Sequence, residues 1–266
     1  MKNILFLALL LLGISLEATA QAGIAVTPGR VYYNLAEGTD GTQTIKVTNP
    51  TDVELEIGVS FSDWNYLENG NNNIQDPGTL PNSCADWIQV LPDTYFVLDP
   101  GETKEVEVLM EVPQNAKKET PVRTSMIFFT QLNPGNARDQ KGASIQVTVR
   151  MGVKVYHSFT KQNAGELEIV DFKNYKDEED HKMIEINVKN TSDIWVNGNV
   201  SWEVFNKNTG KTKTLDQQEF YTLPDDLRIV KQQLPDDLEK GDYTVSAILT
   251  YGDSDTINIA ELDFSL

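Results

Sequence analysis

Cysteine is nearly absent from this chain of 266 residues, and Cys84 is the only one. A single cysteine excludes an internal disulfide, so buried apolar area has to stabilise the fold, which domains of ordinary size can achieve. We interpret Cys84 as a small core residue rather than as a reactive thiol. A thiol nucleophile with His157 as its base is the alternative, but no third group or local signature accompanies that pair.

Histidine is equally scarce, and neither His157 nor His181 has the spacing of a metal ligand. His181 follows the acidic run 177–180, which indicates a solvated turn. The sequence also lacks a phosphate-binding glycine loop, a nucleophile elbow and a dinucleotide fingerprint. We therefore predict no catalytic residue, no metal and no cofactor, and hence a protein that is not an enzyme.

Positive charge is in short supply. The chain has 22 Lys and Arg residues against 40 Asp and Glu residues, a formal net charge of -18. Such an acidic surface repels phosphate groups and anionic lipids. The composition therefore argues against nucleic acid as a partner and against direct insertion into a membrane.

Long apolar runs are confined to the start of the chain. A basic beginning at Lys2, an apolar run over 4–12 and the small residues 18–20 predict a cleavable signal peptide over residues 1–20. The mature chain would then begin at Gln21 and would be exported and soluble. An uncleaved membrane anchor is the alternative, which the short run and the small residues after it disfavour.

Helical periodicity is almost missing, whereas short segments that alternate apolar and polar residues recur between Gly, Pro, Asn and Asp turns. This pattern predicts an all-β protein with two immunoglobulin-like β-sandwich domains in tandem, 21–158 and 166–266, joined by a linker over 159–165. The strands expected in the first domain are 24–26, 30–35, 42–48, 55–64, 87–91, 95–98, 104–111, 123–131 and 143–158. Those expected in the second are 167–172, 183–188, 195–205, 211–215, 219–223, 227–232, 242–251 and 256–264.

An internal repeat favours the same two-domain organisation. Residues 45–52 and 59–61 align without gaps on 186–193 and 200–202, with Ile, Val, Asn, Asp, Val and Ser in register. We interpret each copy as an inward-facing strand, a polar corner at the Asn, and a following strand with a core aromatic. Convergence of two sandwich corners is the alternative, and it too implies two sandwiches.

Three segments of the first domain carry a family pattern. Residues 26–33, followed by 45–49, form a Thr-Pro-Gly-Arg-Val element before a turn and an apolar strand ending in Asn. Residues 118–129 carry Arg, then small polar residues, then an apolar aromatic run. Residues 145–156 alternate apolar residues and end in Lys-Val-Tyr. These segments resemble the periplasmic pilus-assembly chaperones, the PapD-like family, and the resemblance covers the first domain well and the second only as architecture.

This resemblance implies a surface that lends a strand to an incomplete exported subunit. A strand with exposed N–H and C=O groups can add a foreign strand, and its alternating side chains give selectivity. The alternative is an ordinary edge strand whose apolar row, which continues to Val153 and Val155, faces its own core. The residues that the resemblance assigns to strand lending are Ile145, Val147, Val149 and Met151.

The resemblance also implies an anchor for the terminal carboxylate of the partner. Arg30 and Lys154 would lie in the cleft between the two domains, where two cations make charge-assisted hydrogen bonds to a buried carboxylate. Arg30 has a planar guanidinium with donors in a fixed geometry, and Lys154 has a compact ammonium. Together they would set the register of the bound chain. The alternative is a pair of unrelated surface cations.

The leading hypothesis is thus a periplasmic chaperone or assembly factor that holds exported protein subunits, pilin-like or other envelope proteins, by β-strand addition. An outer-membrane assembly pore is a further partner that the resemblance implies. Two departures put the pilin substrate in doubt: the chain is strongly acidic, and residues 65–82 are an insertion, with an Asn-rich part at 68–73 that we interpret as a mobile surface loop. A structural or adhesive envelope module of tandem domains, with no folding client, is the alternative hypothesis.

Overall fold

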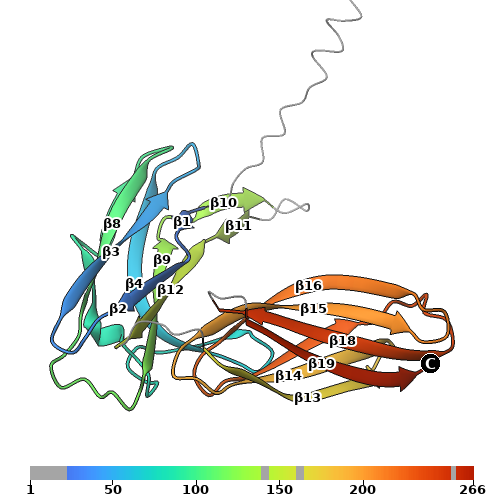
Figure 1. Ribbon diagram of the computed structural model, residues 1–266. Helices are drawn as coiled ribbons and strands as arrows, with labels where there is room; N and C mark the ends of the chain where they lie inside the picture. The colour runs from blue at the N-terminus through green and yellow to red at the C-terminus, as the bar shows by residue number, and fades with distance from the viewer. Residues whose placement is uncertain (1–22, 139–143, 160–164, 253–255) are drawn as a thin grey trace, which may run out of the picture.

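The computed structural model describes residues 23–138, 144–159, 165–252 and 256–266, and these form two β-sandwiches that meet at an angle (Figure 1). The signal peptide predicted over 1–20 lies outside the described residues. Among the strands that are described, none of the first sandwich pairs with one of the second. The predicted fold class, two immunoglobulin-like sandwiches in tandem, is therefore confirmed, while the domain boundaries stay a prediction.

The first sandwich packs a four-stranded sheet, β1-β3-β8-β6, against a six-stranded sheet, β2-β12-β9-β4-β5 with β7 paired to β4. Its core lies between the sheets, where Ile45, Val106, Ile127, Phe129 and Val155 are fully buried. A separate ribbon, β10-β11, extends from the larger sheet. The bounds are β1 (Ala25–Thr27), β2 (Arg30–Asn34), β3 (Asp40–Thr48), β4 (Leu55–Tyr66), β5 (Asn72–Gln75), the 3-10 helix η1 (Ala85–Trp87), β6 (Ile88–Leu91), β7 (Tyr95–Leu98), β8 (Thr103–Glu111), β9 (Val122–Gln131), β10 (Gly135–Arg138), β11 (Ser144–Val147) and β12 (Arg150–Ser158).

The second sandwich packs a three-stranded sheet, β13-β14-β17, against a four-stranded sheet, β16-β15-β18-β19. Alternate residues of β18 face inward, and Trp202 lies fully buried between the sheets. Within the described ranges, no helix is long and apolar enough to cross a membrane. The bounds are β13 (Leu167–Lys176), β14 (Lys182–Asn190), β15 (Val196–Asn206), β16 (Thr212–Thr222), β17 (Leu227–Gln233), β18 (Asp242–Tyr251) and β19 (Thr256–Ser265).

The internal repeat corresponds to a real structural repeat. Asn49 follows β3 and Asn190 ends β14, and both side chains are fully buried. The Asn49 amide donates to the carbonyl of Val53 at 2.7 Å, and the Asn190 amide donates to the carbonyl of Ile194 at 2.9 Å. In each copy the Asn oxygen accepts from the backbone N–H two residues later, at 2.9 Å. The same side chain thus satisfies the buried backbone at the same corner of both sandwiches.

Most predicted strands are found within a few residues of their expected ends, but four expectations are wrong. The strand expected over 143–158 is two strands, β11 and β12, and the strands expected over 211–215 and 219–223 are one, β16. Residues 72–75, within the expected loop, form β5, and residues 135–138, where no strand was expected, form β10. Pairing accounts for the two additional strands: β5 pairs with the end of β4, and β10 pairs with β11.

Candidate functional site

Strand β12 has one edge that is only partly covered. On one side it pairs with β9 along its whole length. On the other side it pairs in parallel with β2, but only from Lys154, opposite Arg30, to Ser158, opposite Asn34. In the part of the chain that the structure describes, no strand pairs with residues 150–153 on this second side. The outward backbone groups of these residues are therefore available to an added strand.

The uncovered edge continues past a break into the ribbon of β10 and β11. Thr148 and Val149 belong to neither β11 nor β12. Beyond them antiparallel pairing resumes, with Gly135 opposite Val147 and Arg138 opposite Ser144. The Gln131 N–H still donates to the Val149 carbonyl at 2.9 Å, but Pro134 on the opposite strand has no N–H to donate. The register also shifts here, from Arg150 opposite Thr130 to Val147 opposite Gly135, and this irregularity divides the predicted single strand.

The four residues assigned to strand lending have different surroundings. Met151 lies on the same side of β12 as the buried Val153 but beyond the core, and 36% of its surface is exposed. Val147 is 43% exposed. Val149 is half-buried, with Gly23 in close contact, and Ile145 pairs through its backbone with Ala137, while its side chain is outside the description.

The apolar row therefore divides at the end of the core. Val153 and Val155 face the sandwich interior, as the ordinary edge-strand interpretation expected, whereas Met151 and Val147 are open to an added chain. Their role in strand lending stays a proposal. The accessible part of the row lies on the amino-terminal side of Lys154, so an added strand along it would approach the anchor pair at one end.

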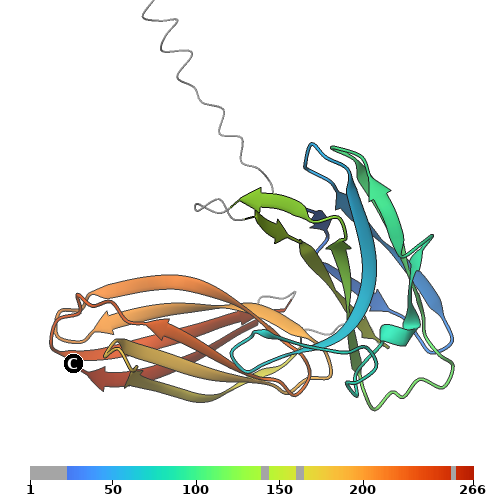
Figure 2. The ribbon, with the colours of Figure 1, turned by 180° about the vertical axis from the view of Figure 1, so that it is seen from behind.

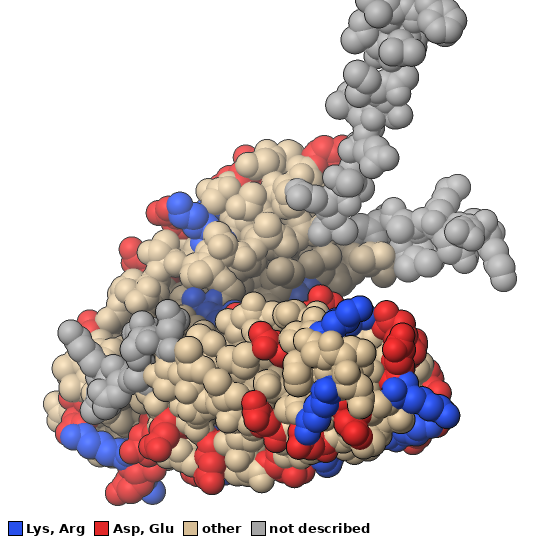
Figure 3. Space-filling view, turned by 45° about the vertical axis from the view of Figure 1, so that its right-hand side comes forward, with Lys and Arg blue, Asp and Glu red and all other residues tan. Residues whose placement is uncertain are grey.

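Arg30 and Lys154 are neighbours across the parallel β2-β12 pair. Alternation along both strands sends their side chains to the face opposite the buried Val31 and Val155, which is the face toward the second domain. Figure 3 shows Lys and Arg atoms in the hollow between the two domains. The structure thus brings the two predicted anchor residues side by side, and their role as a carboxylate anchor stays a prediction.

Aromatic side chains surround both cations. The Lys154 ammonium lies 4.4 Å from the ring centroid of Trp64 and 4.2 Å from that of Tyr66, and it donates to the Tyr66 hydroxyl at 3.0 Å. The Tyr66 hydroxyl is 3.1 Å from that of Tyr156. The Arg30 guanidinium lies 4.0 Å from the ring centroid of Tyr221, a residue of the second domain. Ring faces and phenol oxygens hold the cations without neutralising them.

The charge in this cleft is uncompensated. Across the described ranges, neither Arg30 nor Lys154 forms an ion pair with a carboxylate. The Arg30 Nε is buried without a hydrogen-bond partner. Burial, together with the neighbouring positive charges of Arg30 and Arg228, lowers the pKa of Lys154 to about 8. An anion placed here would relieve both the repulsion and the unsatisfied donor.

A third cation, Arg228 of strand β17, approaches from the second domain, and the sequence did not single it out. Its guanidinium lies 5.7 Å from the ring centroid of Tyr66, the same ring that contacts Lys154. Arg228 lies on the same side of β17 as the buried Val230, but the weak alternation of strand 227–232 gives no sequence signal for that position. Only the contact between domains reveals it.

The two domains meet through an apolar cluster next to these cations. Trp64, Tyr66 and Tyr156 of the first domain pack with Leu223 and Trp195 of the second. The ring centroids of Tyr156 and Trp195 are 5.3 Å apart. Aromatic contacts of this kind contribute about 0.5–1.5 kcal/mol each beyond their buried area. The cluster therefore holds the cations of both domains close to one another.

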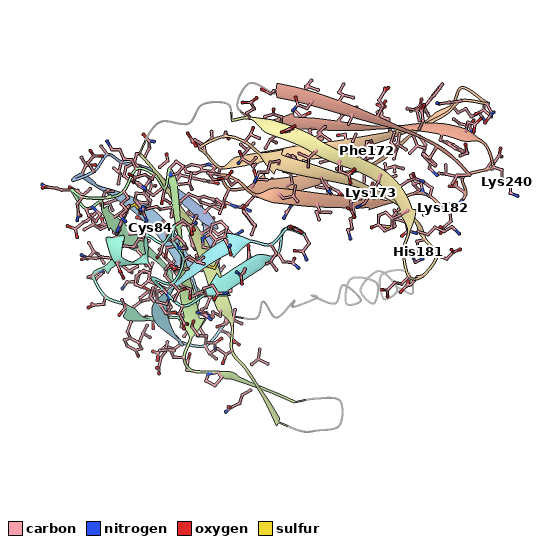
Figure 4. All side chains as sticks on the ribbon, turned by 90° about the horizontal axis from the view of Figure 1, so that it is seen from below. Cys84, Phe172, Lys173, His181, Lys182 and Lys240 are labelled. Atoms are coloured by element: carbon pink, nitrogen blue, oxygen red, sulfur yellow. The ribbon has the colours of Figure 1, made fainter. Side chains whose placement is uncertain are left out.

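The residues considered for nucleophilic or metal chemistry have structural surroundings. Cys84 is buried inside the first domain, and burial raises the pKa of its thiol (Figure 4). His157 is buried beside the rings of Trp87 and Phe159, and its Nε2 lies 3.0 Å from the Leu35 carbonyl. His181 lies at the turn between β13 and β14, where its Nδ1 is 3.1 Å from Asp177. The core and turn interpretations of Cys84 and His181 are confirmed.

Comparison with known proteins gives similarity in structure but not in sequence. No family model matches the chain, and none of the curated proteins matches it. The solved structure of the YadV chaperone is 13% identical, with a TM-score of 0.48, over 91% of this chain and 99% of that one. The class 5 fimbriae chaperone CfaA is 11% identical, with a TM-score of 0.45, over 91% and 98% of the two chains.

A third similar structure is a chaperone and tip-adhesion subunit pre-assembly complex, CsuC-CsuE, from archaic chaperone-usher pili of Acinetobacter baumannii. It is 12% identical, with a TM-score of 0.46, over 90% of this chain and 98% of that one. Each of these similar structures covers about 90% of this chain.

Proposed function

We propose that this protein is a non-enzymatic periplasmic chaperone that holds an exported subunit by β-strand addition. The observation that carries the proposal is the continuity of two features: the uncovered edge at residues 150–153 leads directly to the paired cations Arg30 and Lys154. An extended chain added to that edge would gain main-chain hydrogen bonds along its length. Its terminal carboxylate would meet the two cations.

The exposed apolar side chains give the added chain a second source of binding energy. Met151 and Val147 project from the uncovered edge and its extension, where a partner with alternating apolar side chains would bury them. The proposed subunits are pilin-like or other envelope proteins, and the proposal includes an outer-membrane assembly pore as a further partner. Export through the signal peptide predicted over 1–20 is part of the proposal.

The cleft chemistry favours a peptide carboxylate over other anions. Nucleic acids and lipid surfaces carry many negative charges that a chain of net charge -18 repels, whereas the end of a neutral strand carries only one and is repelled much less. The half-buried ring of Tyr221 beside Arg30 provides an apolar contact that a terminal side chain would use. A chain end satisfies both requirements at once.

The test compares affinity-tagged proteins isolated from the periplasm. Arg30→Ala should lose a polypeptide that co-purifies with the wild-type protein, because one of two carboxylate anchors is missing, while the melting temperature stays nearly unchanged. Lys46→Ala is the matched control, since Lys46 is a solvent-exposed cation of the same domain that pairs only with Glu105 at 3.3 Å. The control should retain that polypeptide.

Hydrogen exchange provides the second measurement. Outward-pointing amides within residues 150–153 should exchange rapidly in the free protein and become protected when the identified subunit is bound. A variant Arg30→Ala that holds the subunit as firmly as the wild type would refute the anchor. If the same polypeptides co-purify with Arg30→Ala and with Lys46→Ala, a structural or adhesive module without a client becomes the better description.

A further inference from the structure

Arg228 occupies an unusual position for a cation at a domain interface. It belongs to β17 of the second domain, yet its guanidinium lies near Tyr66 of the first, and its Nη1 is buried without a hydrogen-bond partner. Like Arg30 and Lys154, it forms no ion pair among the residues described. A buried donor on a charged group is costly unless something accepts from it.

The nearest acidic neighbour does not supply that acceptor. Asp226 lies two residues before Arg228, but its carboxylate accepts from the Leu223 backbone N–H at 2.7 Å. Burial raises the pKa of Asp226 to about 6 despite the nearby charge of Arg228. Its position is therefore set by the loop that it closes, and although its charge acts on Arg228 from a distance, the two side chains form no ion pair.

The hairpin formed by β4 and β5 holds Arg228 in place. The backbone N–H of Ile229 donates to the carbonyl of Glu68, at the turn of this hairpin, at 2.8 Å. Gly70 packs directly on the guanidinium of Arg228, and any side chain at that position would overlap it. Figure 2 shows the hairpin extending from the first domain to the second. The Asn-rich stretch interpreted as a mobile loop is thus a contact between the domains.

Three cations from two domains therefore lie around Tyr66 and Tyr156, and within the described residues none of the three forms an ion pair with a carboxylate. We propose that Arg228 is a third anchor for the terminal carboxylate of the bound chain, so that the second domain takes a direct part in capture. The inference rests on the proposed function, whose two anchors both belong to the first domain. The inference adds that the β4-β5 hairpin holds this third anchor, Arg228, in position.

The chemistry of a carboxylate suits this arrangement. Its two oxygens provide about four acceptor positions, enough for an ammonium and two guanidinium groups at once. Such an anion would also bridge the domains, because its partners lie on β2, β12 and β17. Capture should then make the domain arrangement more rigid as well as occupy the edge of β12.

The test uses two fluorescent peptides that alternate valine and threonine, one with a free terminal carboxylate and one with a terminal amide. Binding to the purified full-length protein is followed by fluorescence anisotropy. Arg228→Gln should reduce the preference for the free acid about tenfold, the effect of losing one charge-assisted hydrogen bond. The matched control is Lys231→Gln, which removes the same charge from an exposed position of the same strand, where Lys231 pairs with Glu185.

A pair of glycine variants tests the role of the hairpin. Gly70→Ala should displace Arg228 and reproduce the reduced preference, whereas Gly78→Ala should not. Both glycines have positive φ, 86° and 78°, but nothing lies within 4 Å of a side chain at Gly78. The comparison thus separates backbone strain from contact with Arg228.

Each result has a defined meaning. If Arg30→Ala loses the preference for the free acid and Arg228→Gln keeps it, the third anchor is wrong and the proposed function stands. If the wild-type protein itself binds both peptides equally or binds neither, the carboxylate anchor fails and Arg228 fails with it. A preference lost in Arg228→Gln and kept in Lys231→Gln would establish the inference.

Discussion

Raising the pH should release the bound chain in a range where ordinary lysines keep their charge. The group responsible is Lys154, whose pKa burial lowers to about 8, with Arg30 and Arg228 acting in the same direction. From that value, about 90% of Lys154 is charged at about pH 7 and only about 3% at about pH 9.5. A lysine with a pKa of about 10.4 would still be about 90% charged at about pH 9.5.

The expected loss follows from the sign of this shift. Only charged Lys154 attracts a carboxylate, so affinity for a free-acid peptide falls as pH rises through the pKa of the free protein. The population of charged lysine falls about 30-fold over this range, so affinity should fall about 10- to 30-fold, less if Arg30 alone retains some binding. Burial raises the pKa of Tyr66 and Tyr156, so these phenols stay neutral over the same range.

The assay measures the affinity of the free-acid and amide peptides by anisotropy over this pH range. The amide peptide is the internal control, because it carries no charge for Lys154 to attract and should bind equally throughout. Lys154→Arg should remove the dependence for the free acid, since an arginine stays protonated. Equal loss of both peptides, or a midpoint near the pKa of an ordinary lysine, would refute the interpretation of the cleft.

Two further predictions concern the fold itself. Asn49→Ala and Asn190→Ala should each lower the free energy of unfolding by about 1–3 kcal/mol, because each leaves buried backbone groups unsatisfied. Denaturant unfolding measures this free energy. The control is Asn197→Ala at an exposed position, which should stay within about 0.5 kcal/mol of the wild type. Cys84 should react with a thiol reagent only after unfolding, because its thiol is buried and its pKa is raised; rapid labelling of the native protein at neutral pH would contradict this.

Local pattern determined the strands and the division into two sandwiches. Alternation along a strand depends on which side chains face the core, so segments such as 95–98 and 242–251 are found with the bounds expected from sequence. The repeated Asn corners are local in part: each Asn bonds to residues two and four positions later, but the Asn49 amide also donates to the carbonyls of Leu98 and Asp99. Arg30 and Lys154 were found through a resemblance between short segments, and the structure places them side by side.

Tertiary structure alone decided which part of the edge is open and what completes the cleft. How much of β12 is covered depends on where β2 begins beside it, a pairing between segments about 120 residues apart that neither segment encodes by itself. The position of Arg228 depends on the docking of the β4-β5 hairpin across the domain interface, and side chains that meet only there leave no periodic signal in either strand. Sequence therefore specified the two sandwiches, while contacts between distant segments and between domains specified the cleft.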